Sequence, residues 1–498
     1  MPFVNNVPFF SIFIAMVAGI ITPLIKTERV ALRVTRFAAV IIGLLSAWLL
    51  CSLVQRGEYF TYMMGHYPAP WGNELRAGPL EAFLATVFCV VMVLSLEGGK
   101  RDQFLDISAH KQGGYCLMLN LLLASLLALI YTNDVFTAYV FIEINAITAS
   151  SIVMARRAAT SLVAAVRYLA ITCVGSGLFL MGITLLYTCT GQLLMPGMDK
   201  AVQALAASGE YRIPLLIAMT LVSLGLAIKS GLFPFYGWLP NAYASATTGG
   251  SAVQAGLVSK GYVILLIKLI YRVFTPEVMN QLHVLDILFV MGLIGMITAS
   301  VRAYQEQSTK RMLGFSSAAQ MAYIFMGVGL GSHVGMVAAI YQILAHTVTK
   351  PMLFTAAGTL IRSAHGSKSL HDLRGTARVN PLAGLSFTIG GLSMIGIPLL
   401  AGFASKYYLA IAAVGDPDVM LMVLLFLAGS SVLNALYYLP AIIGIWFPAD
   451  SNVPAPVAVE SGDLSFRLST LGFLVLNFVL GVAIGPVVKL IELGLSLL

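Results

Sequence analysis

Apolar residues fill long runs along this chain, and short polar joints separate one run from the next. A helix rises about 1.5 Å per residue, so about 20 apolar residues span the roughly 30 Å hydrocarbon core of a bilayer. Runs near this length predict about fourteen membrane-spanning helices. They lie at residues 3–25, 30–54, 78–97, 114–132, 134–154, 159–190, 212–240, 246–273, 283–303, 308–331, 334–362, 380–413, 418–447 and 465–491.

No long polar segment interrupts this pattern, so we expect residues 1–498 to form one all-α, polytopic membrane domain. The composition agrees, because 59% of the residues are hydrophobic and only 10% are charged, whereas a soluble domain carries about 25% charged residues. The five cysteines lie singly and form no C-x-x-C motif or Cys/His cluster. We therefore expect no metal, no iron–sulfur cluster and no other cofactor.

Basic residues between the spans are distributed unevenly. If the N-terminus faces outward, the inward joints hold 17 Lys and Arg residues and the outward segments hold 6. Basic joints stay on the cytoplasmic side of a membrane, so we expect both termini to face outward. The net charge of +8 then follows largely from topology and indicates no nucleic-acid partner.

Some basic residues nevertheless fall within the predicted spans. Such a charge costs roughly 2.5–3.5 kcal/mol at a helix centre on insertion scales, so it indicates function by default. We expect Lys268, about one turn from Arg272, to snorkel to the surface instead. Arg167 keeps its proton in proteins and is therefore expected to be a fixed counter-charge. Apart from the 23 counted at the joints, the basic residues within spans are Arg167, Lys229, Lys260, Lys268, Lys350 and Lys406.

Glu143 is the acidic residue that lies deepest in a predicted span, nine residues after Asp134 at the start of that span. A carboxylate about 4 Å from a buried lysine interacts with it by about 4 kcal/mol at an effective dielectric constant near 20. Movement of Glu143 towards or away from a lysine would therefore load or unload a proton. A static ion pair that joins two helices is the alternative.

His346 and Lys350 are four residues apart and share one face of a predicted helix. Histidine titrates near neutral pH and can shuttle protons, so the adjacent lysine favours a proton relay. A histidine that only packs and forms hydrogen bonds remains the alternative.

Prolines interrupt two of the predicted spans. Pro234 and Pro240 lie in the seventh span, which carries Lys229, and Pro398 lies in the twelfth span, which carries Lys406. Corresponding broken helices in two halves of a chain are typical of transporters built from repeats, with the ion path at the breaks. Backbone groups freed by such breaks are tolerated where they line a wet cavity.

Five sequence motifs contain these residues. They are FIEIN around Glu143, KSGLFPFYGWLPNAYASA from Lys229, GLVSKGY around Lys260, AHTVTKPMLF with His346 and Lys350, and GIPLLAGFASK ending at Lys406. Together they resemble the antiporter-like, proton-translocating membrane subunits of respiratory complex I, Mrp-type cation/proton antiporters and energy-converting membrane hydrogenases. The resemblance covers nearly the whole chain.

The resemblance implies fourteen helices with two inverted five-helix repeats, helices four to eight and nine to thirteen, of which helices seven and twelve are broken. Residues 1–110 would hold the first three helices, 111–273 the first repeat, 280–447 the second repeat and 460–498 the last helix. The partners would be other membrane subunits of a complex in a prokaryotic cell (inner) membrane. The chain would then have no redox site of its own.

The resemblance also assigns roles along a polar axis at the membrane midplane. Glu143 and Lys229 would form the pair whose separation changes the acidity of the lysine. Lys260 would be the central relay, joined by His346 and Lys350, and Lys406 would be the terminal lysine at the second break.

The chain departs from the family pattern at three places. Asn241-Ala242-Tyr243 stands where complex I relatives often have Asp-Ala-His, and residues 246–252, ATTGGSA, lack both prolines of the common A-P-T-P-V-S-A. Arg167 stands where lysine is common. These departures favour an Mrp antiporter-type or hydrogenase-type relative over a standard complex I subunit.

We expect the chain to move protons along this axis, coupled to redox chemistry or to cation exchange. An Mrp-type Na⁺/H⁺ antiport subunit that itself carries Na⁺ is the alternative, although lysines repel a cation and only one deep carboxylate is present. A membrane enzyme for lipid-linked substrates would need acidic or metal-binding loops, which the short joints lack. A scaffold of frozen ion pairs is disfavoured by the matched breaks.

Overall fold

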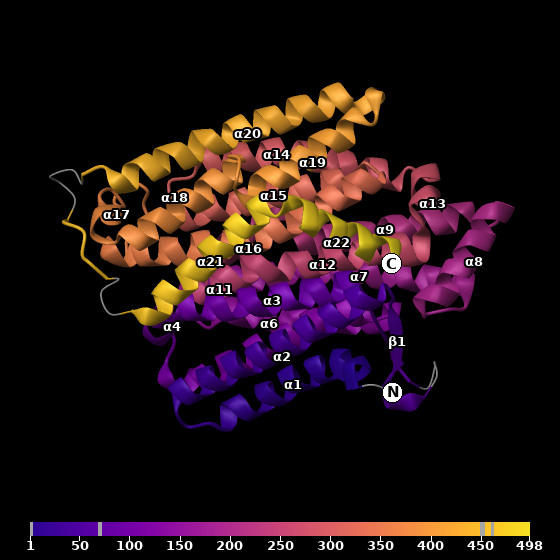
Figure 1. Ribbon diagram of the computed structural model, residues 1–498, viewed down its shortest axis with the longest axis horizontal. Helices are drawn as coiled ribbons and strands as arrows, with labels where there is room; N and C mark the ends of the chain where they lie inside the picture. The colour runs from indigo at the N-terminus through magenta and orange to yellow at the C-terminus, as the bar shows by residue number, and fades with distance from the viewer. Residues whose placement is uncertain (1–2, 68–71, 449–453, 460–462) are drawn as a thin grey trace.

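The computed structural model describes residues 3–67, 72–448, 454–459 and 463–498. Long helices lie side by side and make up nearly the whole molecule (Figure 1). In the described part of the chain, twelve helical segments are long and apolar enough to cross a membrane. Their main helices are α1 (Val7–Ile21), α2 (Glu28–Arg56), α3 (Pro79–Gly98), α5 (Gln112–Tyr131), α6 (Val135–Met154), α7 (Ala159–Thr190), α9 (Arg212–Ser230) with α10 (Leu239–Ser245), α11 (Thr248–Val253) with α12 (Ser259–Leu269), α14 (Val284–Gln305), α15 (Thr309–Gly329), α20 (Pro417–Trp446) and α21 (Leu464–Val482).

The two remaining predicted spans also form helices, but neither is among those twelve segments. α16 (His333–Ser363) is long enough, yet polar residues such as Gln342 and His346 lower its mean hydropathy. It carries these residues because neighbouring helices bury nearly all of it. The other span is divided into α18 (Pro381–Ile395) and α19 (Ala401–Val414). A nearly all-helical membrane fold is confirmed, whereas the count of fourteen and the inverted repeats stay predictions.

The predicted helix breaks lie where the prolines are. α9 is capped by Gly231, whose φ is +75°. Pro234 lies between α9 and α10, and Pro240 is the second residue of α10. α18 ends at Gly396, whose φ is +101°, and Pro398 follows before α19. A left-handed glycine ends a helix without a Cβ clash, and a proline shortly after it cannot continue the helix.

A second irregularity lies between the two breaks. The segment η6 (Gln254–Val258) between α11 and α12 is a π-helix, and α16 contains Pro351. A Cβ atom on Gly256 would lie 2.5 Å from the Cγ atom of Pro351, so the glycine allows α16 to approach η6 this closely. π-Helical turns are frequent at functional sites, and this one ends two residues before Lys260.

Small elements occupy the joints that the hydrophobic pattern leaves unassigned. β1 (Phe60–Met63) and β2 (Glu74–Ala77) pair antiparallel, with Phe60 opposite Ala77. α8 (Met195–Ser208) fills the joint after α7. Short helices occupy three further joints: α4 (Lys100–Asp106), α13 (Pro276–Gln281) and α17 (Thr376–Val379).

The last predicted span, 465–491, is two helices rather than one. α21 ends at Val482 and α22 begins at Ile484 (Ile484–Ser496). Pro486 lacks the N–H that would bond to the carbonyl of Val482, and its ring clashes with that carbonyl in a continuous helix. The predicted C-terminal segment starts at residues 460–462, which lie outside the described residues.

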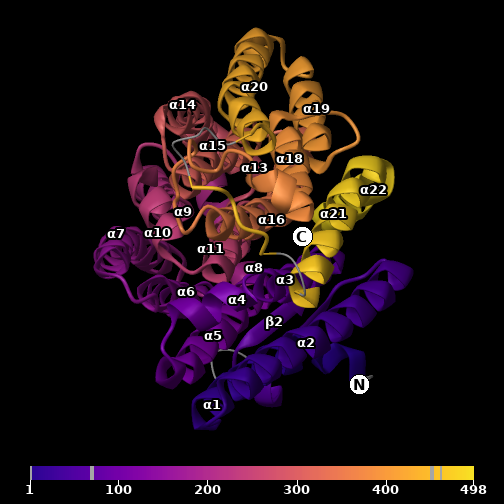
Figure 2. The ribbon, with the colours of Figure 1, turned by 90° about the vertical axis from the view of Figure 1, so that its left-hand side faces the viewer.

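An end-on view shows which helices form the interior (Figure 2). α1 and α2 lie at one end of the assembly, α19 and α20 lie at the other, and α11 and α16 lie between them. All residues in the most apolar stretch of the segment Thr248–Phe274 are buried, whereas 22% of those in the most apolar stretch of α20 are buried. The ionisable residues on α12 and α16 are therefore enclosed by protein.

Candidate functional site

A buried lysine and a carboxylate lie close together next to the first break. Lys229 is on the last turn of α9 and its side chain is 0% exposed, whereas the side chain of Glu143 on α6 is 29% exposed. The Lys229 Nζ atom lies 3.8 Å from Glu143 Oε1 and has no hydrogen-bond partner among the described residues. The Tyr262 ring centroid lies 5.4 Å from the same nitrogen. The carboxylate of Glu143 is therefore the main group that stabilises the positive charge of Lys229.

Lys260 and His346 follow on the two helices that flank η6. The Lys260 Nζ atom donates to the backbone carbonyl of Ala255, within that π-helical segment. His346 is fully buried, and neither of its ring nitrogens has a hydrogen-bond partner in the described part of the chain. Both basic side chains are thus sparsely bonded in the centre of the molecule.

Lys350 has a complete set of acceptors. Its Nζ atom donates to Ser316 Oγ at 2.8 Å, to the Tyr438 hydroxyl at 3.1 Å and to the carbonyl of Leu313 at 3.2 Å. An ammonium group has three N–H donors, so this environment matches protonated lysine without a carboxylate.

Lys406 is bonded in a similar way at the second break. Its Nζ atom donates to the carbonyls of Ile395 at 2.7 Å and Met394 at 3.1 Å, and to Ser431 Oγ at 3.0 Å. The two carbonyls end α18, where the helix dipole places partial negative charge. Lys229 precedes its break and Lys406 follows its own, so the two breaks hold their lysines differently.

The packing of the helices orders these residues. α6 carries Glu143 opposite α9, α9 packs against α12, and α16 packs against η6 on one side and α19 on the other. The predicted site residues therefore follow one another across the bundle, and we call this set the basic row. It consists of Glu143, Lys229, Lys260, His346, Lys350 and Lys406.

Arg167 is the predicted site residue that does not join the basic row. It is exposed on α7 and lines a surface hollow of about 340 Å³ together with Asn241 and Ser245. No ion pair of Arg167 is present among the described residues, and Glu143 pairs with Lys229 instead. The counter-charge role expected for Arg167 stays a prediction.

Lys268 does not snorkel, so that expectation is wrong. It is 1% exposed, and its Nζ atom donates to the carbonyls of Ile130 at 2.5 Å and Thr132 at 2.8 Å. These carbonyls lie at the C-terminal end of α5, where no backbone N–H of that helix is available. Neighbours enclose α12 on all sides, so the nearest acceptors are in the protein rather than in solvent.

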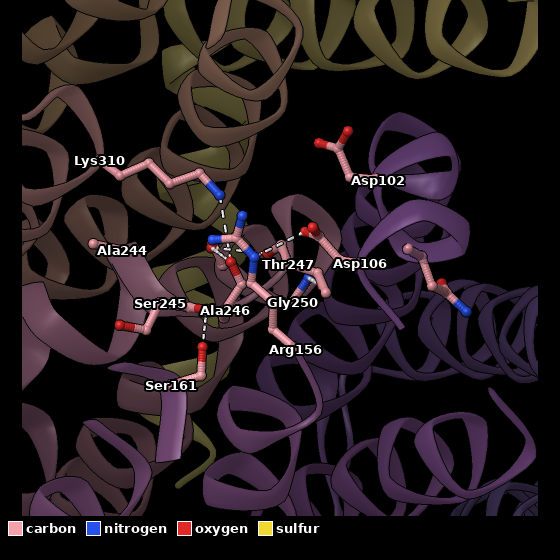
Figure 3. A network of polar contacts seen from close by, with 12 residues as sticks. Asp102, Asp106, Arg156, Ser161, Ala244, Ser245, Ala246, Thr247, Gly250 and Lys310 are labelled. Carbon is pink, nitrogen blue, oxygen red and sulfur yellow. Dashed lines mark hydrogen bonds and ion pairs between the residues drawn. The ribbon is translucent and has the colours of Figure 1, made fainter. Parts of the chain in front are cut away.

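Lys310 is a buried lysine that belongs to the 17 basic residues counted at the inward joints. It is 4% exposed, and its Nζ atom lies 3.4 Å from the carbonyl of Ala246. Figure 3 shows it directed at the junction of α10 and α11, with Arg156 beside Asp106 nearby. Its burial could have been predicted from its position, two residues after the start of the predicted span at 308–331.

Lys368 supports the same junction from outside the spans. Its Nζ atom donates to the carbonyl of Ala244 at 3.1 Å. Burial lowers the pKa of Lys368 from its ordinary value of 10.5, the positive charge of Arg156 acts in the same direction, and Asp106 opposes them. Two lysines therefore bond to carbonyls at the end of the second half of the first broken helix.

The sequence is similar to known proteins over most of its length. A family model described as NADH:quinone oxidoreductase/Mrp antiporter, TM, matches residues 132–433. The chain is 31% identical over 443 residues to the subunit named N of the NADH-quinone oxidoreductase from Desulforudis audaxviator (strain MP104C), covering 87% of this chain and 85% of that protein. It is 26% identical over 489 residues to a Na(+)/H(+) antiporter subunit, named D, from Bacillus subtilis (strain 168), covering 96% and 94%.

A solved structure agrees over the full length. One chain of the membrane-bound sulfane sulfur reductase, an archaeal respiratory membrane complex, has a TM-score of 0.85 and 25% identity to this chain. The match covers 99% of this chain and 96% of that chain. The match to the family model contains the whole basic row.

Proposed function

The chain belongs to the NADH:quinone oxidoreductase/Mrp antiporter family, and we propose that it is an antiporter-like subunit that moves protons in a multisubunit membrane complex. The basic row is the observation that carries this proposal. It places titratable side chains on successive helices of the bundle, with Glu143 at one end next to Lys229. Such residues are costly in a membrane unless they serve a path.

The pair at the start of the row supplies the coupling. Two unit charges 3.8 Å apart attract by about 4 kcal/mol at an effective dielectric constant near 20. Moving one charge across 100 mV represents about 2.3 kcal/mol. Separation of Glu143 from Lys229 therefore changes the energy enough to release a proton from Lys229 into the row. The driving motion must come from partner subunits, because the chain carries no nucleotide-binding or redox motif.

The orientation of the chain in the membrane is a further part of the proposal. We place the chain in a prokaryotic inner membrane, and the 17 inward and 6 outward basic residues favour an orientation with both termini outward. The junction in Figure 3 would then face the cytoplasm. Residues 111–273 and 280–447 would be the two inverted repeats, each with one break and one lysine beside it. Residues 1–110 and 460–498 would flank them.

Sodium transport through this chain is the second candidate function. The Bacillus subtilis relative is named as a subunit of a Na(+)/H(+) antiporter, which favours it. The basic row opposes it, because it brings together one carboxylate and four lysines, and like charges repel a cation. We therefore assign protons to this chain and any sodium path to a neighbouring subunit.

Proton pumping by the assembled complex in vesicles tests the proposal. Lys229→Ala and Glu143→Ala are compared with the parent and with Lys200→Ala, which removes an exposed lysine of α8. We expect both row variants to lose coupled pumping while the control keeps it. Undiminished pumping in both row variants contradicts the pair mechanism. Radioactive sodium uptake that requires Glu143 but not Lys229 supports the second candidate.

A further inference from the structure

The strongest polar connection along the basic row involves residues outside it. Asn434, Tyr437 and Tyr438 lie on α20, three and four residues apart, and therefore share one helix face. All three are buried, although α20 is otherwise among the most exposed helices. α20 packs against α18 and α19, the helices of the second break. A buried polar face on an exposed helix requires partners inside the bundle.

One chain of hydrogen bonds starts at Lys350. Lys350 donates to Ser316 Oγ on α15 at 2.8 Å, and the Tyr437 hydroxyl lies 2.9 Å from the same oxygen. The Tyr437 hydroxyl also bonds to Asn434 Oδ1. A carbonyl oxygen only accepts, and a tyrosine has one hydroxyl proton. Tyr437 is placed as the donor to Ser316 Oγ and also lies within reach of Asn434 Oδ1, so its single proton serves one of these bonds at a time. When that proton is on Asn434, Ser316 donates to Tyr437 and the bonds of this chain point away from Lys350.

The far end of the chain meets Lys406. Asn434 Nδ2 donates to the carbonyl of Met394 at 3.4 Å, and Lys406 Nζ donates to the same carbonyl at 3.1 Å. The amide that holds the Tyr437 hydroxyl thus lies beside the second lysine. The described residues offer no comparable side-chain connection between Lys260 and Lys350, since His346 has no bonded partner there.

We propose that Tyr437 is the hydroxyl relay between Lys350 and Lys406, and that Asn434 holds this relay closed in the arrangement described here. In the transfer, an N–H bond of Lys350 breaks and its proton passes to Ser316. The Ser316 proton passes to Tyr437, and the Tyr437 proton passes to the neutral amine of Lys406, directly or through one water molecule. The hydroxyls regain their protons, so the net change is one proton moved between the two lysines.

Asn434 closes the relay because an amide oxygen accepts a hydrogen bond but does not pass a proton on. The transfer therefore requires the Tyr437 hydroxyl to leave Asn434 and turn towards Lys406. This inference rests on the proposed function, since it assigns a role within the same basic row. Tyr437 differs from the lysines in that it never holds the transported charge at rest.

The first test removes only the hydroxyl. Tyr437→Phe keeps the ring, and Tyr341→Phe is the matched control, because Tyr341 is also buried and its hydroxyl donates to the carbonyl of Leu480 away from the row. We expect Tyr437→Phe to lower coupled pumping by the assembled complex at least tenfold, and Tyr341→Phe to keep the parental rate. Parental pumping by Tyr437→Phe overturns the relay.

The second test separates a relay from a structural role. Asn434→Leu is expected to raise the passive proton flux into vesicles when no driving reaction runs. Adding Tyr437→Phe to Asn434→Leu is expected to return that flux to the parental level, because the leak passes through the hydroxyl. A leak that persists in the double variant overturns the relay, and an Asn434→Leu variant as tight as the parent overturns the role of Asn434.

Failure of this inference is distinguishable from failure of the proposed function. If Lys229→Ala abolishes pumping and Tyr437→Phe does not, the relay is wrong and the proton-moving function stands. If Lys229→Ala pumps at the parental rate, the proposed function fails, and the relay within it fails as well.

Discussion

The Nζ atom of Lys229 lies 3.8 Å from Oε1 of Glu143, and no described residue offers this buried nitrogen a hydrogen bond. Two other lysines of the row need no carboxylate, because Lys350 and Lys406 each meet three oxygen acceptors. The charge of Lys229 is therefore the one that depends on a single, partly exposed partner. A partner subunit that moves Glu143 would act on this lysine before the others.

This dependence predicts a stability effect at the pair. Removal of one member of a buried ion pair leaves an uncompensated charge and costs about 3–5 kcal/mol, whereas removal of both is often neutral. Because Glu143 is partly exposed, we expect Glu143→Gln to fall at or below the lower end of that range. Thermal unfolding of the purified complex should show a lower Tm for Glu143→Gln and recovery in Glu143→Gln/Lys229→Met. A double variant less stable than the single one contradicts the pairing.

The second break predicts a functional effect of one methyl group. Gly396 has a φ of +101°, and a Cβ atom there would lie 3.0 Å from Cδ of Lys406. Gly366 has a φ of +88° with open space around it, so Gly366→Ala is the matched control. Both alanine variants should lose about 1–2 kcal/mol of stability, because L-residues are strained in this region. Only Gly396→Ala should also lower proton pumping; equal pumping in the two variants would exclude a role for this contact.

Lys368, one of the two lysines at the junction of α10 and α11, predicts a pH dependence of stability. Burial lowers the pKa of Lys368 below its ordinary value of 10.5. In the window between the lowered value and 10.5 the unfolded chain binds more protons than the folded one, so stability rises with pH. The Tm of the parent should therefore rise relative to that of Lys368→Met as pH increases towards 10.5. Lys200→Met, which removes an exposed lysine, provides the control; a constant difference between parent and Lys368→Met would refute the assignment.

Lys268 provides a contrast with the lysines of the basic row. Its replacement by Met leaves the carbonyls at the end of α5 without their donor, and a buried unsatisfied acceptor costs about 1–3 kcal/mol. Lys268→Met should lower the Tm of the complex by a corresponding amount and leave pumping per assembled complex unchanged. Lys489→Met, at an exposed lysine of α22, should change neither quantity. Loss of pumping in Lys268→Met, with assembly intact, would place Lys268 in the path.

The sequence predicts how far along a helix a residue lies better than it predicts which neighbours its side chain meets. Prolines after Lys229 and before Lys406 locate both breaks, because a proline constrains its own backbone. Lys268, which the pattern places at the surface, is buried instead, because its acceptors come from neighbours that the local pattern does not contain. Lys268 bonds to carbonyls more than 130 residues away in the chain.

The relay on α20 shows the same limit more strongly. Tyr437 and Ser316 are 121 residues apart in the chain, and the pattern of α20 alone reads as an apolar span. Only the packing of α15, α16 and α20 brings Ser316, Lys350 and Tyr437 together. Long-range hydrogen bonds of this kind have no signal in hydrophobic periodicity.

The most direct test of the proton path is the number of protons moved per turnover of the driving reaction in Lys260→Met, at the centre of the row. The variant keeps an unbranched side chain one atom shorter and removes the amino group that carries the proton. If protons cross through the basic row, the driving reaction continues or slows while the protons moved by this subunit per turnover fall to zero. A parental proton number per turnover in Lys260→Met would show that protons do not pass through Lys260.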